Sequence, residues 1–255
     1  MKSYKFTDYT YLEIKDFVDA RCLAIVPTGC TEQQGPHLPI DFDTWFSETV
    51  ALAAAKHAGR CYQVCALVLP AMPFGPTPEH KGFGSGYVNL PHSVHEECVY
   101  FALVSLAEQG FSAIVVWRGC GEHRLQGAVD RFNAKCRSQC TAYLPSLPYR
   151  DIWLRVGDLA VPCGHADSFA TSIDMYHRPQ AVRLDRIPSP NSGVVDWNNP
   201  HLDFTNYSET GVIGDATKAS TELGRTFWNE VVSTTAALFR DVAFNCTPPR
   251  GFRIR

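Results

Sequence analysis

Residues 24–43 read AIVPTGCTEQQGPHLPIDFD, and this stretch organises the rest of the chain. A short apolar run at 23–26 ends at Pro27 and Gly29, and a helix-like segment begins near residue 44. The loop between them holds side chains that can bind a metal or transfer protons: Glu32, Gln34, His37, Asp41 and Asp43. Such groups gather where a buried strand ends, so the loop indicates a metal or acid–base site. The plainer alternative is that the two aspartates cap the helix and that the histidine fills the loop.

Short apolar segments alternate with longer helix-like segments along the chain. The predicted strands are 22–26, 64–69 and 112–117, with a possible fourth at 152–156. The predicted helices are 11–20, 44–57, 93–109, 122–136 and 215–239. Strands of five or six apolar residues between helices of ten or more predict a parallel sheet covered on both faces. We therefore expect one α/β domain over residues 1–255.

Composition and charge exclude several classes of partner. The net charge is −3 and the isoelectric point is near 6.3, which gives no electrostatic reason to expect nucleic acid or an anionic membrane as a partner. No apolar run approaches the roughly 18–20 residues needed to cross a bilayer. The first residues, MKSYKFTDYTYLEIKDF, lack the apolar core of a signal peptide, so we expect a cytoplasmic protein.

The ten cysteines are dispersed and contain no CxxC pair. Because no export signal is recognised, we expect reduced and mostly buried thiols rather than disulfides. Most of these cysteines need no function. Cys120 is the exception, because it follows the predicted strand at 112–117 within the turn Arg-Gly-Cys-Gly-Glu-His.

The motif at 27–39, Pro-Thr-Gly-Cys-Thr-Glu-Gln-Gln-Gly-Pro-His-Leu-Pro, closely resembles the signature of the creatininase family. That family typically shows Gly-Ser-Thr-Glu-Gln-His-Gly-Pro-His-Leu-Pro with an aspartate several residues later. The turn at 118–123 resembles the family's Asn-Gly-His-Gly-Gly-Asn, or Gly-His-x-Glu-Asn in creatininase itself. The segment at 164–172 resembles His-Ala-Gly-x-x-Glu-Thr-Ser, and 211–219 resembles Gly-Val-x-Gly-Asp-Pro-Thr. These four blocks occur in the family's order and span roughly residues 22 to 224.

This resemblance implies a three-layer α/β/α sandwich with a mainly parallel central sheet, assembled into a homo-oligomer, often a hexamer. It also implies hydrolysis of a C–N bond by a metal-activated water. Glu32, Asp43 and Glu122 match the family's ligand positions in kind, whereas Gln34 and Cys120 stand where the family has histidine. The family's active-site histidine falls on His165, and its nearby glutamate falls on Ala170.

Charge and ligand chemistry define the expected cofactor. Glu32, Asp43, Glu122 and a Cys120 thiolate would place about four negative charges in one pocket, and a divalent cation would relieve their repulsion. A thiolate favours zinc, with iron or manganese as other possibilities. We therefore expect one tightly bound metal, most readily zinc, and a second metal that is weak or absent because Gln34 is a neutral and weak ligand.

The resemblance also assigns roles around the expected metal. Glu122 would position or deprotonate the attacking water, and His165 would deliver a proton to the leaving nitrogen. Further residues that support the ligands or contact a small-molecule substrate are His37, His80, Asp167 and Trp197. The expected substrate is a small cyclic amide, a formamide or a related metabolite, and the reaction is opening or closure of a C–N bond.

Two alternatives stay open. In the first, Gly-Cys-Gly at 119–121 is a nucleophile elbow, and Cys120 attacks a carbonyl with His165 or His123 as the base. Three nearby carboxylates would oppose formation of that thiolate, so this alternative ranks second. In the second, the chain is a catalytically inactive structural or binding member of the family.

Overall fold

A sheet of four parallel strands runs through the centre of the computed structural model, which describes residues 3–120, 123–136, 139–157, 164–191 and 194–246. The strands are β1 (Leu23–Thr28), β2 (Ala66–Val68), β3 (Ala113–Arg118) and β4 (Thr141–Tyr143), and their order across the sheet is β2-β1-β3-β4. The central pair is in register from Ala24 opposite Ile114 to Thr28 opposite Arg118. The chain moves from β1 to one side of the sheet and from β3 to the other, so these two strands flank a topological switch point.

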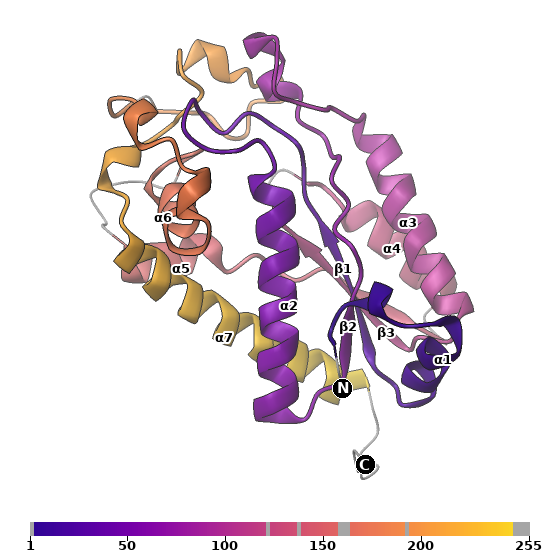
Figure 1. Ribbon diagram of the computed structural model, residues 1–255. Coiled ribbons are helices and arrows are strands. Elements are labelled where there is room, and N and C mark those ends of the chain that lie inside the picture. Colours follow the sequence, from indigo (N-terminus) through magenta and orange to yellow (C-terminus); the bar gives the residue numbers. More distant parts are fainter. Residues whose placement is uncertain (1–2, 121–122, 137–138, 158–163, 192–193, 247–255) are drawn as a thin grey trace.

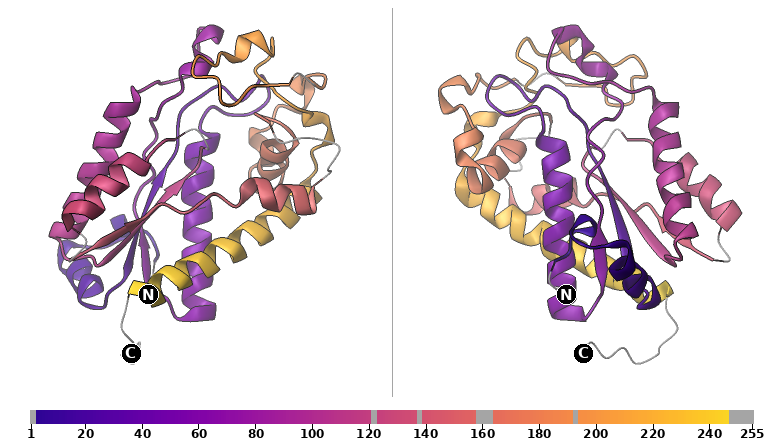
Figure 2. Two further views of the ribbon diagram at one scale, coloured as in Figure 1. Left: turned by 180° about the vertical axis from the view of Figure 1, so that it is seen from behind. Right: turned by 45° about the vertical axis from the view of Figure 1, so that its right-hand side comes forward.

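Helices cover both faces of this sheet (Figures 1 and 2). One face packs against α2 (Phe42–Tyr62) and α7 (Thr221–Cys246), and α5 (Tyr149–Val156) and α6 (Ser168–His177) pack in turn on α7. The other face packs against α1 (Tyr11–Asp19), α3 (His92–Glu108) and α4 (Gln126–Cys136). The predicted three-layer α/β/α sandwich with a parallel sheet is therefore confirmed.

The two central strands supply both cores because successive side chains of a strand point to opposite faces. Leu23 and Ile25 of β1 join the α2–α7 core, together with Trp117 of β3. Ala24 and Val26 of the same strand join the core under α3 and α4. Every residue of β1 is buried, as expected for a strand covered on both faces. Within the described residues, every helix is too short or too polar to span a membrane.

Two expectations about local structure are wrong. Residues 152–156 are not a strand but the end of α5, in which Ile152 and Trp153 are buried while Arg155 is on the surface. That short apolar run suits a half-buried helix as well as it suits a strand. The expectation of reduced thiols fails for Cys22 and Cys65, which are joined in a disulfide. They directly precede β1 and β2, whose pairing brings the two Cα atoms to 4.6 Å.

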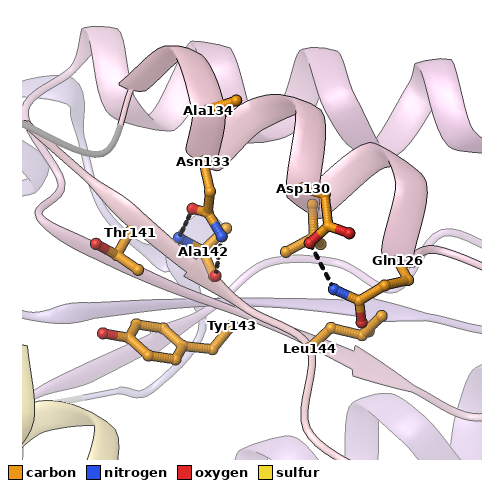
Figure 3. Close-up of a pocket in the computed structure, with 9 residues that line it drawn as sticks. Gln126, Asp130, Asn133, Ala134, Thr141, Ala142, Tyr143 and Leu144 are labelled. Atoms are coloured by element: carbon orange, nitrogen blue, oxygen red, sulfur yellow. Dashed lines mark hydrogen bonds between the residues drawn. The ribbon is translucent and has the colours of Figure 1, made fainter.

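Within the described residues, the outer edge of β4 pairs with one side chain rather than with a fifth strand. Asn133 of α4 accepts a hydrogen bond from the Ala142 N–H at 2.8 Å and donates one to the Ala142 carbonyl at 2.9 Å. Its amide thus takes the place of a neighbouring strand and satisfies backbone groups that would otherwise be open to another chain. A surface cavity of ≈ 600 Å³ lies beside this contact between α4 and β4 (Figure 3).

Candidate active site

The candidate site lies beyond the carboxyl ends of β1 and β3, at the topological switch point of the sheet. The loop after β1 contributes a run of polar side chains, and the turn after β3 lies against the start of α2. Gly119 allows this approach: its N–H donates to the Thr28 carbonyl at 2.6 Å, and a Cβ there would lie 2.4 Å from the Asp43 carbonyl oxygen. Parallel sheets bind ligands at this kind of crevice.

Glu32 is the central carboxylate of the site and is buried, with 3% of its surface exposed. Its Oε2 lies 3.4 Å from His80 Nε2, and its Oε1 lies 3.3 Å from His165 Nε2. Burial favours the neutral acid, but the charge of His80 and hydrogen bonds with both histidines outweigh it and hold the pKa of Glu32 well below its ordinary value. Glu32 is therefore an anion enclosed between two imidazoles.

His80 belongs to the loop after β2 and is the charged partner of Glu32. Its Nε2 also lies 3.5 Å from Glu79 Oε1, and Gln33 Nε2 lies 3.0 Å from its Nδ1. Burial opposes protonation of His80, but the charges of Glu32 and Glu79 and the hydrogen bonds with them outweigh it and raise the pKa of His80 to about 10. The positive charge of His80 therefore lies beside two buried carboxylates, those of Glu32 and Glu79.

Asp43, at the start of α2, lies on the other side of Glu32. Gln34 Nε2 donates to Asp43 Oδ2 at 3.0 Å and to Glu32 Oε1 at 3.3 Å, so its amide bridges the two carboxylates. Burial and the charge of Glu32 raise the pKa of Asp43 well above its ordinary value. The pocket therefore has negative charge that the described protein groups do not fully compensate.

Two thiols and an imidazole adjoin these carboxylates. Cys30 Sγ lies 3.0 Å from Glu32 Oε2 and 3.3 Å from Asp43 Oδ2, and the ligand atoms of Cys30, Cys120 and His123 all lie within 4.8 Å of one another. Burial and the hydrogen bond with Cys120 raise the pKa of Cys30 well above its ordinary value. For Cys120, the hydrogen bond with Cys30 favours the thiolate, but burial and the charges of Glu32 and Asp43 outweigh it and raise the pKa to about 11.

His37 and Asp167 support the loops rather than face the carboxylates. His37 is fully buried, and its Nε2 lies 2.8 Å from Thr171 Oγ1 of α6. Asp167 caps α6: one carboxylate oxygen accepts from the Phe169 N–H at 2.9 Å, and the other accepts from the Gly164 N–H at 2.7 Å. By fixing the turn around it, Asp167 holds His165 in place.

Aromatic rings border the two histidines of the site. The ring centroid of Phe204 lies 4.9 Å from that of His80 and 5.1 Å from that of His165. Trp197, 39% exposed, packs edge-on against Phe204. His165 is oriented by its Nδ1, which donates to the Gly211 carbonyl at 2.8 Å, so that Nε2 points to Glu32.

The structure brings together the predicted ligands that it describes, with His80 and His165 beside them. His37, Asp167 and Trp197 pack around this group instead, and Glu122 lies outside the described residues. Sequence reasoning did not select Cys30, Gln33 or Glu79, and it considered His123 only as a base for a cysteine nucleophile. The available signal for Cys30 was its place two residues before Glu32, in the loop itself. The signal for Glu79 was its position directly before His80.

Comparison with known proteins places this arrangement in one family. The family model described as creatinine amidohydrolase matches residues 7–239. A mycofactocin precursor peptide peptidase of Mycolicibacterium smegmatis is 29% identical over 223 residues, covering 83% of this chain and 81% of the relative. The protein of the same description from Mycobacterium tuberculosis strain H37Rv is 31% identical over 225 residues, covering 82% of this chain and 80% of the relative.

Solved structures share the fold. A manganese form of creatininase superimposes with a TM-score of 0.82 at 21% identity, covering 97% of this chain and 100% of that one. A creatininase described as a Zn–Zn type superimposes with a TM-score of 0.81 at 22% identity, with the same coverage of both chains. At this level of identity the likeness establishes the architecture.

Proposed function

The chain belongs to the creatininase family, and from this premise we propose that it is a metal-dependent hydrolase that cleaves an amide C–N bond of a peptide substrate. The peptide substrate is supported by the curated relatives, which are peptidases of a precursor peptide and align over about four fifths of their length. Small cyclic amides and formamides, the class expected from the sequence, contain the same bond and belong in the same test. The observation that carries the proposal is the buried Glu32, which contacts His80, His165 and Cys30 and lies in one ligand group with Cys30 and Asp43.

The donor set fits a divalent cation. Glu32 and Asp43 are both buried, and Cys120 lies at their edge, so a cation there would neutralise charge that raises the pKa of Asp43. By family resemblance Glu32, Asp43, Cys120 and Glu122 would surround the ion, and Cys30 lies within ligand distance of both the buried carboxylates and Cys120. A bound divalent metal supplies a Lewis acid that polarises a carbonyl and acidifies water.

His165 is the group placed to move a proton in this site. Its Nδ1 hydrogen is engaged by the Gly211 carbonyl, which leaves Nε2 facing Glu32 and the space beside it. An imidazole so held can pass a proton to a leaving nitrogen. Phe204 packs against both histidines and limits the access of water to their rings.

The cysteine-nucleophile alternative is disfavoured by the electrostatics of the pocket. A nucleophilic cysteine needs a lowered pKa, whereas the pKa of Cys120 is raised to about 11 and that of Cys30 is raised as well. Without a cation, both sulfurs are held as thiols beside carboxylates. Loss of activity on thiol alkylation would distinguish this alternative from the metal-dependent reaction.

The test is a hydrolysis assay on three substrate classes: short peptides, lactams and N-formyl compounds, with products identified by mass spectrometry. We expect cleavage of a peptide amide that is lost after chelation and restored by zinc or manganese. Activity that survives chelation but is lost on thiol alkylation would replace this proposal with the cysteine mechanism. Absence of turnover on all three classes by fully metal-loaded protein would favour the inactive family member.

A further inference from the structure

The thiol pair beside the carboxylates forms a ligand cluster of its own. Cys30 comes from the loop after β1, and Cys120 and His123 come from the turn after β3, so two adjacent strands deliver all three groups. Their ligand atoms lie within 4.8 Å of one another. Bonds of about 2.0–2.3 Å in a tetrahedral zinc site place ligand atoms roughly 3.3–3.8 Å apart, so small side-chain rotations would close the cluster around one ion.

Only one member of this cluster, Cys120, stands where the family pattern has a metal ligand. Against that pattern, the chain lacks imidazoles at Gln34 and Cys120, where the family has histidine. In the same two loops it gains donors at Cys30, where the family pattern has serine, and at His123, where it has asparagine. Compared with the family pattern, the chain therefore lacks two imidazoles but has a new sulfur donor and a new nitrogen donor in the same two loops.

The carboxylates of the site already have several protein partners. Glu32 contacts His80, His165 and the Gln34 amide, and Asp43 also contacts that amide. By contrast, His123 is fully buried, and its Nε2 has no hydrogen-bond partner among the residues that the structure describes. The two thiols hydrogen-bond to each other, and Cys30 also donates to the carboxylate oxygens of Glu32 and Asp43.

The surroundings of His123 fix its ring. Its Nδ1 lies 3.3 Å from Thr28 Oγ1, at the end of β1, and its ring packs edge-on against His95 with centroids 4.6 Å apart. Gly75 provides the room, because a Cβ at that position would lie 2.4 Å from Nε2. An imidazole oriented by neighbouring groups in this way is typical of metal ligands.

We propose that Cys30 and His123, together with Cys120, form a sulfur-rich ligand set for one zinc ion, whose open side faces Glu32 and Asp43. Three protein ligands and one open position are the arrangement of catalytic zinc sites, and thiolates select zinc over manganese or magnesium. Binding releases the thiol protons, and the two thiolate charges balance the ion. This proposal deepens the proposed function and relies on it for the place of the metal, but its test reads the metal's ligands rather than hydrolysis.

The experiment is cobalt substitution of the full chain under reducing conditions. Protein stripped of metal and reloaded with Co²⁺ should show a thiolate-to-cobalt charge-transfer band in the near ultraviolet. Cys30→Ser and Cys120→Ser should each lose about half of that band, one of two thiolates. His123→Asn should keep the band but weaken cobalt affinity about tenfold or more. Two control variants should leave both the charge-transfer band and the cobalt affinity unchanged. They are Cys98→Ser, at an exposed thiol, and Cys140→Ser, at the buried thiol directly before β4.

The outcomes separate this proposal from the proposed function. A full band in Cys30→Ser, or cobalt bound without any charge-transfer band, would overturn the ligand set even if the protein hydrolyses peptides. A Cys30–Cys120 disulfide that persists in reductant and excludes cobalt would overturn it as well. A band with the expected losses, in protein that cleaves no amide, would support the ligand set and reject the hydrolase. Because serine is close in size to cysteine, circular dichroism should confirm that each variant is folded.

Discussion

Gln34 places its amide nitrogen 3.0 Å from Asp43 Oδ2, at the position where the family pattern has an imidazole. The amide donates hydrogen bonds to two carboxylates, Glu32 and Asp43, and so joins them without a cation. We predict that Gln34→His raises the metal content toward two ions per chain, because an imidazole restores a strong neutral ligand beside Asp43. Elemental analysis of wild type and variant checks this. Gln33→His is the control, since Gln33 contacts His80 and Gly211 instead. Equal metal content in Gln34→His and wild type would show that the amide is not what excludes the second ion.

His165 should be required for turnover but not for metal binding. Its Nε2 faces Glu32, and its loss removes the proton donor for the leaving nitrogen. We predict that His165→Gln lowers kcat about 10²–10⁴-fold with metal content unchanged. The control is His177→Gln, at an exposed histidine of α6 that packs on Trp45 and Trp228. Full activity of His165→Gln would remove this residue from the reaction.

The sheet and its helices could be predicted from sequence because each central strand is a continuous apolar run. β4 was not predicted, since Thr141–Tyr143 is only three residues long and only Ala142 in it is buried. Periodicity also cannot separate a short apolar run such as 152–156 from a helix. The polar side chains of residues 32–43 indicated a metal or acid–base site, and the resemblance to the creatininase family selected Glu32 and Asp43 as its ligands.

The thiol cluster could not be predicted, because Cys30 lies about ninety positions before Cys120 and His123 in the sequence. The pairing of β1 with β3 is what brings them together. The role of Gln34 was visible only in part. Its identity indicated a weak ligand, but the hydrogen bonds that join Glu32 and Asp43 through it depend on the fold of the loop.

The stability of the fold should decrease on mild acidification, partly because of His37. Burial, with the charge of His165, lowers the pKa of His37 to about 4, so the unfolded chain binds this proton more readily than the folded chain. The penalty therefore begins as pH falls below about 6.5 and grows until about pH 4, to roughly 2–3 kcal/mol. Urea unfolding between pH 7 and 4 should show a shallower loss of stability for His37→Gln than for wild type. Parallel pH profiles for the two proteins would contradict this assignment.

Asn133 should stabilise the edge of the sheet. Its amide satisfies both outward backbone groups of Ala142, and Asn133→Ala would leave them without this partner. We predict a decrease of about 1–3 kcal/mol in the free energy of unfolding, measured by urea titration. Gln126→Ala, which removes an exposed hydrogen bond to Asp130 on the same helix, should change stability by about 0.5 kcal/mol or less. A similar small change for Asn133→Ala would mean that water replaces the amide at this edge.

The most direct test of the metal-dependent site is metal content per chain, measured by elemental analysis on protein purified without chelators or a metal-carrying tag. We predict about one zinc ion per chain in wild type, and loss of that ion in Cys120→Ser, because sulfur ligands hold it. Retention of zinc in that variant would show that the carboxylates, rather than Cys120, hold the ion. A wild-type protein that contains no metal, and takes up none from solution, would contradict the metal-dependent hydrolase.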